Sequence, residues 1–241
     1  MRIPRIFTYQ SLAENQRVRL EENPSQHLSK VLRLQEGAQL IVFNGKGGQF
    51  EAAIDTIEKK HITITIGKFN PIDRESPLNI HLGIALSKGD RMEFIVQKAT
   101  ELGVNVISPV FSSRSEVKLK GDRAEKKLQH WQQIVISACE QCGRNIPPTI
   151  HPVQTLDHWL SHSSADLKFV LHHRTEQSLD TRAKVENVDL LIGPEGGLSD
   201  IEIQSALHSS FVPLAIGPRV LRTETAPLAA ITLLQYIWGD I

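Results

Sequence analysis

Two short turns carry the residues whose types and spacing point to chemistry. The first is IGPEGG, residues 192–197, which follows an apolar run typical of a buried strand. The second is IGP, residues 216–218, which follows another apolar run and leads into RTET, residues 222–225. Glycine lets a backbone approach a flat ligand, and proline fixes the turn. Because ligands of parallel sheets bind beyond the carboxyl ends of strands, we expect two neighbouring strands to end at one ligand site.

The composition of the first turn restricts the class of ligand. The turn matches neither of the phosphate-binding motifs GxxxxGK[ST] and GxGxxG. Glu195 places a carboxylate where a phosphate cradle needs lysine or bare amides, and a carboxylate repels phosphate. Exposed backbone N–H and C=O groups can instead hydrogen-bond to the edge of an adenine. The turns therefore favour an aromatic ligand with an apolar body, and they argue against an enzyme that binds nucleotide phosphates.

An ordinary connection between a strand and a helix explains part of this pattern. One Gly-Pro alone is typical of such a turn, and Thr225 is expected to cap the last helix, with Pro227 in its first turn. The repetition of the turn, together with Arg222, Thr223 and Glu224 just after it, exceeds what a turn requires. We therefore favour a ligand site.

The elements that must position these turns follow two patterns. Residues 1 to about 70 contain short β-like runs, and NGKGG at residues 44–48 is a strong hairpin signal. After a linker at about residues 69–78, strands alternate with helices, which indicates a mainly parallel sheet covered on both faces. Strands are predicted at residues 78–86, 104–111, 168–173, 188–193 and 212–217, and helices at residues 92–102, 124–142, 201–207 and 227–238.

The composition is that of an ordinary α/β protein with room for two domains. Of its 241 residues, 40% are hydrophobic and 22% charged, and 27 basic residues balance 27 acidic ones. No stretch has the apolar length of a signal peptide or membrane span, so we expect a cytoplasmic protein without a membrane partner. Cys139 and Cys142 lack the further ligands that a metal site needs, so we expect two structural thiols and no metal.

Four motifs together resemble the RsmE family of bacterial ribosomal RNA uridine methyltransferases, which belongs to the SPOUT superfamily. They are HLSKVLRLQEG at residues 27–37, QKATELGV at 97–104, IGPEGGLSDIE at 192–202 and IGPRVLRTETA at 216–226. The resemblance extends over essentially the whole chain. It implies a small PUA-like β-barrel domain for RNA at residues 1–72 and a SPOUT-type, trefoil-knotted α/β methyltransferase domain at residues 73–241. It also implies a homodimer with the active site near the subunit interface.

The cofactor implied by this resemblance is S-adenosylmethionine, which has an adenine and a sulfonium but no phosphate. The absence of a lysine from the first turn agrees with such a ligand. By resemblance, the cofactor site consists of Leu171, His172, Ile192, Gly193, Pro194, Glu195, Gly196, Gly197, Leu214, Ala215, Ile216, Gly217, Leu221 and Thr225.

The implied reaction is transfer of a methyl group to N3 of a uridine in 16S ribosomal RNA of the 30S subunit. N3 must lose its proton, and a nearby cation can stabilise the charge that spreads onto the uracil oxygens. Arg222 is the candidate for that cation, and an ion pair with Glu195 or Glu224 is its alternative role. Either glutamate is a candidate general base, and either could instead cap amides or orient the loop.

RNA contacts are expected at cations in two regions. Residues 1–77 contain 11 Lys and Arg against 9 Asp and Glu, and residues 112–127 contain six basic and three acidic residues. A solvated charged face is the alternative for either region. The candidates are Arg2, Arg5, Lys30 and Arg33 in the first region, Arg114, Lys118 and Lys120 in the second, and Lys88 and Arg144 outside both.

Two other functions stay open at this point. A related SPOUT enzyme could methylate another RNA atom, such as a ribose 2′-oxygen. A non-catalytic RNA-binding or ribosome-assembly protein would explain the basic regions, but it would not need the paired glycine turns.

Overall fold

The chain divides into two compact units. The computed structural model describes residues 3–115, 117, 119–172 and 184–241. The first unit is Met1–Glu75 together with Cys139–Pro147, and the second is Ser76–Ala138 together with Pro148–Ile241. The division expected from the sequence, between residues 72 and 73, does not include Cys139–Pro147. This segment begins with the last turn of a predicted helix, and periodicity does not show which unit a helix end belongs to.

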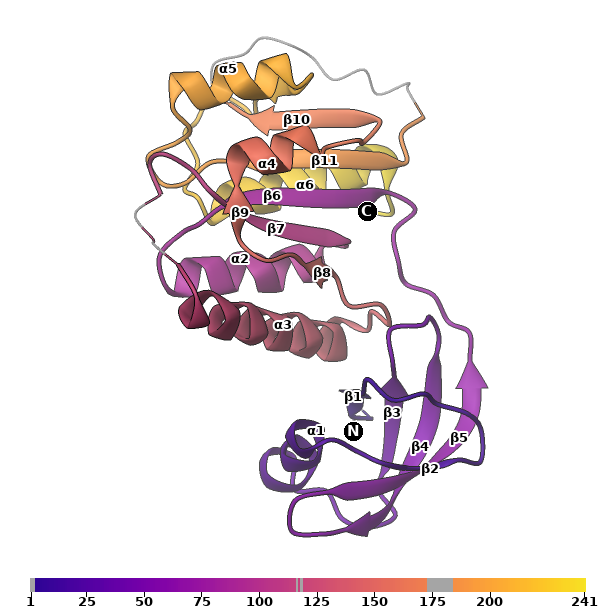
Figure 1. Ribbon diagram of the computed structural model, residues 1–241. Helices are drawn as coiled ribbons and strands as arrows, with labels where there is room; N and C mark the ends of the chain where they lie inside the picture. The colour runs from indigo at the N-terminus through magenta and orange to yellow at the C-terminus, as the bar shows by residue number, and fades with distance from the viewer. Residues whose placement is uncertain (1–2, 116, 118, 173–183) are drawn as a thin grey trace. The chain divides into compact units, whose positions relative to one another are not determined.

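The described part of the first unit contains a five-stranded sheet in the order β1-β3-β4-β5-β2 (Figure 1). Its strands are β1 Arg5–Phe7, β2 Arg17–Arg19, β3 Gln39–Phe43, β4 Gln49–Ile57 and β5 Ile62–Asn70. β3 and β4 pair antiparallel across NGKGG, where Gly45 and Gly47 have positive φ, so the predicted hairpin is confirmed. β1 and β2 are too short for a sequence pattern to reveal them.

The core of this unit comes from alternate strand positions and one helical turn. Ile62, Ile64 and Ile66 of β5 are at most 1% exposed, as the two-residue period of a strand requires. Helix α1 (Glu22–Gln26) continues into a π-helical turn, η1 (His27–Val31), whose Leu28 is buried in the same core. π-helical turns are rare and often lie at functional sites.

The second unit contains a parallel sheet, as predicted. In the described residues its order is β12-β10-β11-β6-β7-β8, with β9 beside β7, and every pair of strands is parallel. The strands are β6 Asn79–Ala85, β7 Val106–Phe111, β8 Thr149–Ile150, β9 Gln154–Thr155, β10 Leu167–Leu171, β11 Asn187–Ile192 and β12 Val212–Leu214. The trefoil knot stays a prediction.

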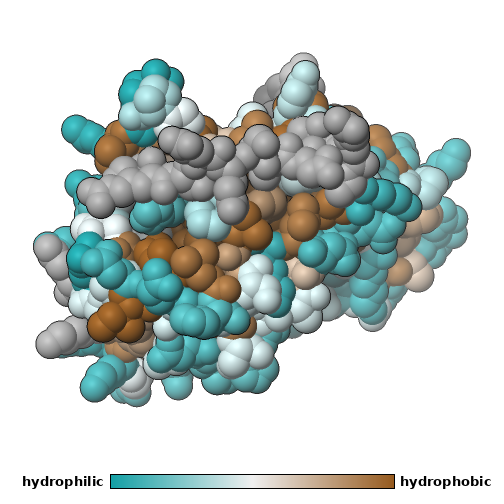
Figure 2. Space-filling view, turned by 90° about the horizontal axis from the view of Figure 1, so that it is seen from above, coloured by the Kyte–Doolittle hydropathy of each residue, from teal (hydrophilic) through white to brown (hydrophobic). Residues whose placement is uncertain are grey.

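Helices cover both faces of this sheet (Figure 1). They are α2 Asp90–Glu101, α3 Asp122–Cys142, α4 Leu156–Ser161, α5 Asp200–His208 and α6 Thr225–Trp238. α4 and α5 share one core with strand residues such as Val170, whereas Trp238 of α6 stacks on Phe169, the neighbouring residue of β10. Successive strand residues point to opposite faces, so α6 covers the other face. Seen from the α5 side, apolar residues are exposed among hydrophilic ones (Figure 2), and Ile201 of α5 is 79% exposed.

Neither a membrane span nor a metal cluster is found in the described residues. Within them, no helix is long and apolar enough to cross a membrane, and no group of three or more His, Cys, Asp or Glu could hold a metal ion. Cys139 is buried and Cys142 is partly exposed, and both thiols are free. Burial raises the pKa of Cys139 to about 12, so this thiol is unreactive at neutral pH.

Candidate functional site

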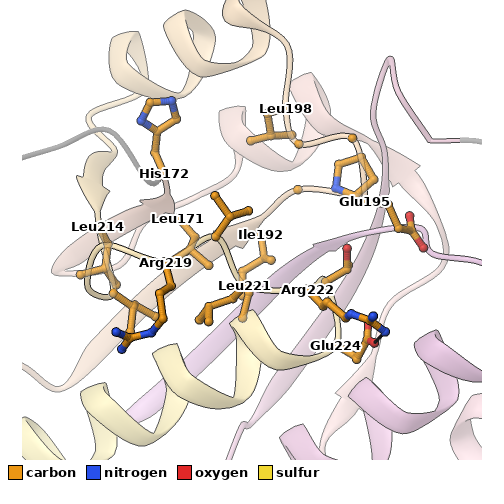
Figure 3. Close-up of a pocket in the computed structure, with 18 of the residues that line it drawn as sticks. Leu171, His172, Ile192, Glu195, Leu198, Leu214, Arg219, Leu221, Arg222 and Glu224 are labelled. Atoms are coloured by element: carbon orange, nitrogen blue, oxygen red, sulfur yellow. Dashed lines mark ion pairs between the residues drawn. The ribbon is translucent and has the colours of Figure 1, made fainter.

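Three segments that follow strands of the second unit enclose a cavity of about 590 Å³ (Figure 3). Leu171 is the last residue of β10 and His172 follows it. Residues 192–198 begin at the last residue of β11 and residues 214–224 at the last residue of β12, and Arg91 of α2 also lines the cavity. The volume lies within the range of small-ligand sites, and the position beyond the carboxyl ends of parallel strands is where such sites occur. The cavity thus joins the two glycine turns that the sequence singled out.

One expectation about these turns is wrong. β11 and β12 are not neighbours, because β10 lies between them in the sheet. Strand order depends on how the connections cross the sheet, which residue periodicity does not encode. The consequence is that β10 adds Leu171 and His172 to the cavity.

Most residues expected around the cofactor line this cavity. Ala215 and Thr225 are the two expected residues that do not line it. The further lining residues, which were not assigned to the cofactor site, include Arg91, Leu198, Arg219 and Val220.

The first turn, residues 193–198, is folded tightly on itself. A Cβ on Gly193 would lie 2.9 Å from the backbone nitrogen of Leu198, and Gly197 has a φ of +68°. The N–H of Gly197 also donates to the carbonyl of Pro194. Glycine at both positions is therefore required by the backbone of the turn itself.

Side chains from other elements hold the first turn in place. Arg114 donates from Nη1 to the carbonyl oxygens of Gly196 and Leu198, at 2.8 and 3.3 Å. Ser113 donates to the carboxylate of Glu202, which with Ser199 forms a capping box at the start of α5. The guanidinium of Arg114 thus supports the first turn, and its expected contact with RNA stays a prediction.

The second turn and the segment after it are more open. Gly217 has a φ of +68°, and a Cβ there would meet only Nη2 of Arg219, at 3.8 Å. Val220 is 79% exposed and the Arg222 side chain is 83% exposed. In the view of Figure 3, Arg219 and Arg222 lie toward opposite ends of the cavity, with Leu221 between them.

The last helix begins one residue earlier than expected. Glu224 occupies the N-cap position and Thr225 is already helical, so the predicted N-cap at Thr225 is wrong, although Pro227 lies in the first turn as expected. The carbonyl of Arg222 accepts hydrogen bonds from the N–H groups of Thr225 and Ala226. This backbone arrangement leaves the Thr225 side chain with no capping role.

Three ion pairs link the charged residues of the site. Arg91 lies 2.7 Å from Glu195 and 3.8 Å from Glu224, and Arg222 lies 3.9 Å from Glu224. Sequence reasoning missed Arg91. The helix predicted from the sequence begins at Met92, after Arg91, and the two partners of Arg91 lie more than a hundred residues away in the chain.

The ionisation of Glu195 follows from these contacts. Burial alone would raise the pKa of Glu195, but hydrogen bonds from backbone N–H groups and from Arg91 outweigh it and lower the pKa below the usual value. The same hydrogen bond raises the pKa of Arg91, with a further contribution from the charge of Glu224. Glu195 is therefore held as an anion by Arg91, which makes it a weak base.

Lys30 and Arg33 lie in an exposed segment of the first unit. Lys30 is in η1 and Arg33 follows it with a φ of +52°, an uncommon conformation for a residue with a side chain. Both are exposed, as are Val31 at 66% and Leu32 at 39%. The segment presents two cations around two apolar side chains.

Arg5 and Arg144 are engaged within the first unit. Arg144 is 4% exposed and paired with Glu75. Arg5 donates to Asn145 and to the carbonyl of Arg144, and its guanidinium lies over the ring of Phe43. A phosphate would have to compete with these contacts, and the predicted role of both residues in RNA binding stays a prediction.

The remaining cations expected to bind RNA belong to the second unit or lie outside the described residues. Lys88 and Lys120 are exposed. Lys88 and Arg91, with Glu195, line a second hollow of about 500 Å³. Arg2 and Lys118 lie outside the described residues.

Two protein-family models match this chain. The model for an RNA methyltransferase domain matches residues 74–235, and that for an RNA methyltransferase PUA domain matches residues 20–67. "Ribosomal RNA small subunit methyltransferase E" of Buchnera aphidicola subsp. Schizaphis graminum is 40% identical, with 100% of this chain and 98% of that protein covered. The chain belongs to this methyltransferase family. The Bacillus subtilis protein of the same name is 30% identical over 87% of this chain and 86% of its own length.

Solved structures of the family agree with the fold. A methyltransferase from Legionella pneumophila, in complex with the bound cofactor SAM, has a TM-score of 0.96 at 40% identity. Ribosomal RNA small subunit methyltransferase E from Neisseria gonorrhoeae, bound to S-adenosyl methionine, has a TM-score of 0.93 at 40% identity. Each match covers 100% of this chain and 100% of the other protein's chain. The predicted family, the α/β fold with a PUA-like first domain and the methyltransferase class are thus confirmed.

Proposed function

We propose that this chain transfers a methyl group from S-adenosylmethionine to N3 of a uridine in 16S ribosomal RNA of the 30S subunit. The observation that carries the proposal is the cavity between the two glycine turns, in a chain that belongs to the ribosomal RNA small subunit methyltransferase E family. Residues 1–72 would contribute a PUA-like RNA-binding domain, and residues 73–241 the knotted catalytic domain.

The cavity has the chemistry that S-adenosylmethionine requires. Leucine and isoleucine side chains such as Ile192 and Leu221 form an apolar wall for an adenine, and the glycine turns expose backbone groups to its edge. No lysine is among the described lining residues, and two of the three lining arginines, Arg91 and Arg222, are paired with Glu195 and Glu224. When bound, the cofactor supplies an electrophilic methyl group on its sulfonium.

Arg222 is the residue that would stabilise charge on the uracil. Loss of the N3 proton leaves negative charge on the uracil oxygens, and a fixed cation lowers the energy of that charge. The Arg222 side chain is 83% exposed, and its ion pair with Glu224, at 3.9 Å, is long. Its guanidinium is therefore available to an incoming base, whereas that of Arg91 is shared between two glutamates.

Of the two candidate bases, Glu224 is the better placed. Glu195 is committed to Arg91 and to backbone amides. Glu224 has only longer ion pairs, 3.8 and 3.9 Å, and lies beside Arg222 at the same end of the cavity (Figure 3). We assign Glu195 to holding the turn and Glu224 to the N3 proton.

RNA would be bound by exposed cations of both units. Lys30 and Arg33 flank Val31 and Leu32 in the first unit, and Lys88 and Lys120 are exposed in the second. Cations contact the phosphates, while exposed apolar side chains can pack on unstacked bases. The cations would therefore contact phosphates and would not read individual bases.

The RNA surface predicts a change in the salt dependence of binding. Replacing both Lys30 and Arg33 with alanine should reduce the slope of log affinity against log salt by about two, or one for each lost phosphate contact. Filter binding of 30S subunits across salt concentrations measures this slope. The matched control replaces Lys59 and Lys60 in the β4–β5 connection of the same unit. If the slope changes equally in both variants, or changes in neither, Lys30 and Arg33 do not contact RNA phosphates.

The active enzyme is proposed to be a homodimer that works in the cytoplasm. Exposed aromatic side chains support a second subunit, since Phe94 of α2 is 42% exposed and Tyr236 of α6 is 74% exposed on two helices that contact each other. Sedimentation equilibrium should give twice the mass of the 27.0 kDa chain. A single-chain mass at micromolar concentration would exclude the dimer.

Mass spectrometry of 16S RNA from cells with and without this protein tests the proposed reaction. We expect 3-methyluridine to disappear from one position when the protein is absent and to return with the wild-type protein. Loss of a ribose-methylated nucleotide instead would assign the chain to 2′-oxygen methylation. No change in any methylated nucleotide would indicate a non-catalytic role in ribosome assembly.

A further inference from the structure

We propose that Arg91 is a positioning residue that holds the first turn of the cofactor cavity and the segment after β12 at a fixed separation through Glu195 and Glu224. The inference rests on the proposed function, because it assigns a role within the same cavity. It concerns a residue of α2, which precedes both turns in the chain by about a hundred residues or more.

The contacts of Arg91 reach the first turn and the end of the segment after β12 from one side chain. Its Nη1 donates to Glu195 at 2.7 Å, and its Nε lies 3.8 Å from Glu224. Glu195 belongs to the turn after β11, and Glu224 is the N-cap residue of α6, directly after the segment that follows β12. A planar guanidinium with several donors can address two carboxylates in one fixed geometry.

The other supports of each turn are separate. Arg114 holds the first turn at the carbonyls of Gly196 and Leu198, and the carbonyl of Arg222 joins the second segment to the start of α6. Neither support reaches both turns. Since the cavity lies between these segments, a side chain that contacts both can set its width.

Arg91 also supplies the charge that the site needs. Two carboxylates at one end of a cavity repel each other, and a cation between them offsets that repulsion. With Arg91 removed, Glu195 and Glu224 would move apart or draw Arg222 away from the substrate. The predicted consequence is a loss of both cofactor affinity and turnover.

A lysine at this position should restore only part of the function. Its ammonium is a point charge and lacks the planar set of donors, so it can pair with Glu195 or with Glu224 but cannot hold both in one plane. Arg91→Lys is therefore expected to lie between the wild-type protein and Arg91→Ala.

The test is a pair of double-mutant cycles measured on the affinity for S-adenosylmethionine by calorimetry. One cycle combines Arg91→Ala with Glu195→Gln, and the other combines Arg91→Ala with Glu224→Gln. We expect Arg91→Ala to weaken binding about 10-fold, and each double variant to deviate from additivity by about 3-fold or more. Lys98→Ala is the matched control, because Lys98 lies on the same helix and pairs only locally, with Glu101.

Turnover at saturating cofactor and the midpoint of thermal unfolding complete the test. A positioning role predicts that kcat falls with Arg91→Ala and partly recovers with Arg91→Lys while the midpoint stays within a few degrees of wild type. Additive effects in both cycles would overturn the inference. So would a loss of cofactor affinity that is fully explained by a lower midpoint of thermal unfolding. The double-mutant cycles are measured without RNA. An enzyme that binds the cofactor but does not methylate 30S subunits would therefore contradict the proposed function and leave the coupling measured in the cycles unchanged.

Discussion

The two glycine turns of the cavity resemble each other in sequence and differ in how they are held. The turn after β11 is fixed at three residues, with Glu195 bound by Arg91 and the carbonyls of Gly196 and Leu198 bound by Arg114. The segment after β12 presents exposed side chains, including Val220 at 79% and Arg222 at 83%. We infer that the first turn grips the cofactor and that the second also faces the acceptor RNA.

This difference shows how similar motifs acquire separate roles. Both turns begin with Ile-Gly-Pro, but only the first has a carboxylate directly after the proline. That carboxylate forms an ion pair with Arg91 of α2. The second has an arginine, Arg219, directly after the proline, and this residue is exposed to solvent.

The largest expected effect comes from removing the exposed cation of the second segment. Arg222→Ala should lower methylation of 30S subunits about 100- to 1,000-fold, because the charge on the uracil loses its stabilising partner. Its affinity for S-adenosylmethionine should stay within about 3-fold of wild type, since 83% of the side chain is exposed to solvent. Single-turnover kinetics and calorimetry measure the two quantities. Intact turnover would remove Arg222 from catalysis.

A smaller effect separates the two glycines. Gly193→Ala brings a Cβ within 2.9 Å of the Leu198 nitrogen, so the backbone must shift, and cofactor affinity should fall about 10-fold or more. Gly217→Ala has space but must keep a φ of +68°, which costs about 1–2 kcal/mol of stability. Calorimetry and thermal unfolding on both variants distinguish these effects. Equal losses of affinity would contradict the assignment of the tighter grip to the first turn.

The smallest expected effect is a dependence of stability on pH at the first turn. The folded protein lowers the pKa of Glu195, so its ionised form contributes stability above its unfolded value of 4.5, and this is lost as pH falls through the lower folded pKa. Glu195→Gln should therefore be less stable than wild type at neutral pH, and the difference should shrink below pH 4.5. Thermal unfolding from pH 3 to 7 measures it. A difference that does not change with pH would rule out the ion pair as its cause.

Much of the fold could be predicted because it depends on local pattern. Alternating apolar residues gave β3, β4 and β5, and the helical spacing of Met92, Ile95, Val96 and Ala99 gave α2, all four being at most 1% exposed. The strands β1, β2, β8 and β9 were missed, since runs of two or three residues have no period to read. Their pairing is set by tertiary contacts instead.

The site could be predicted only in part, for a related reason. Glycine and proline mark their own turns, so residues 193–197 and 217 were found from sequence. Arg91 was not found, because an ion pair between residues 91 and 195 leaves no trace in either local sequence. The position of β10 between β11 and β12 was likewise hidden, because strand order is a property of the whole sheet.

A crystal structure of this protein grown with S-adenosylmethionine tests the central claim most directly. We predict electron density for the adenosyl group between the turn at residues 193–198 and the segment at residues 214–224, with the sulfonium toward Arg222 and Glu224. Density for the cofactor elsewhere on the molecule, or an empty cavity at saturating concentration, would contradict the account.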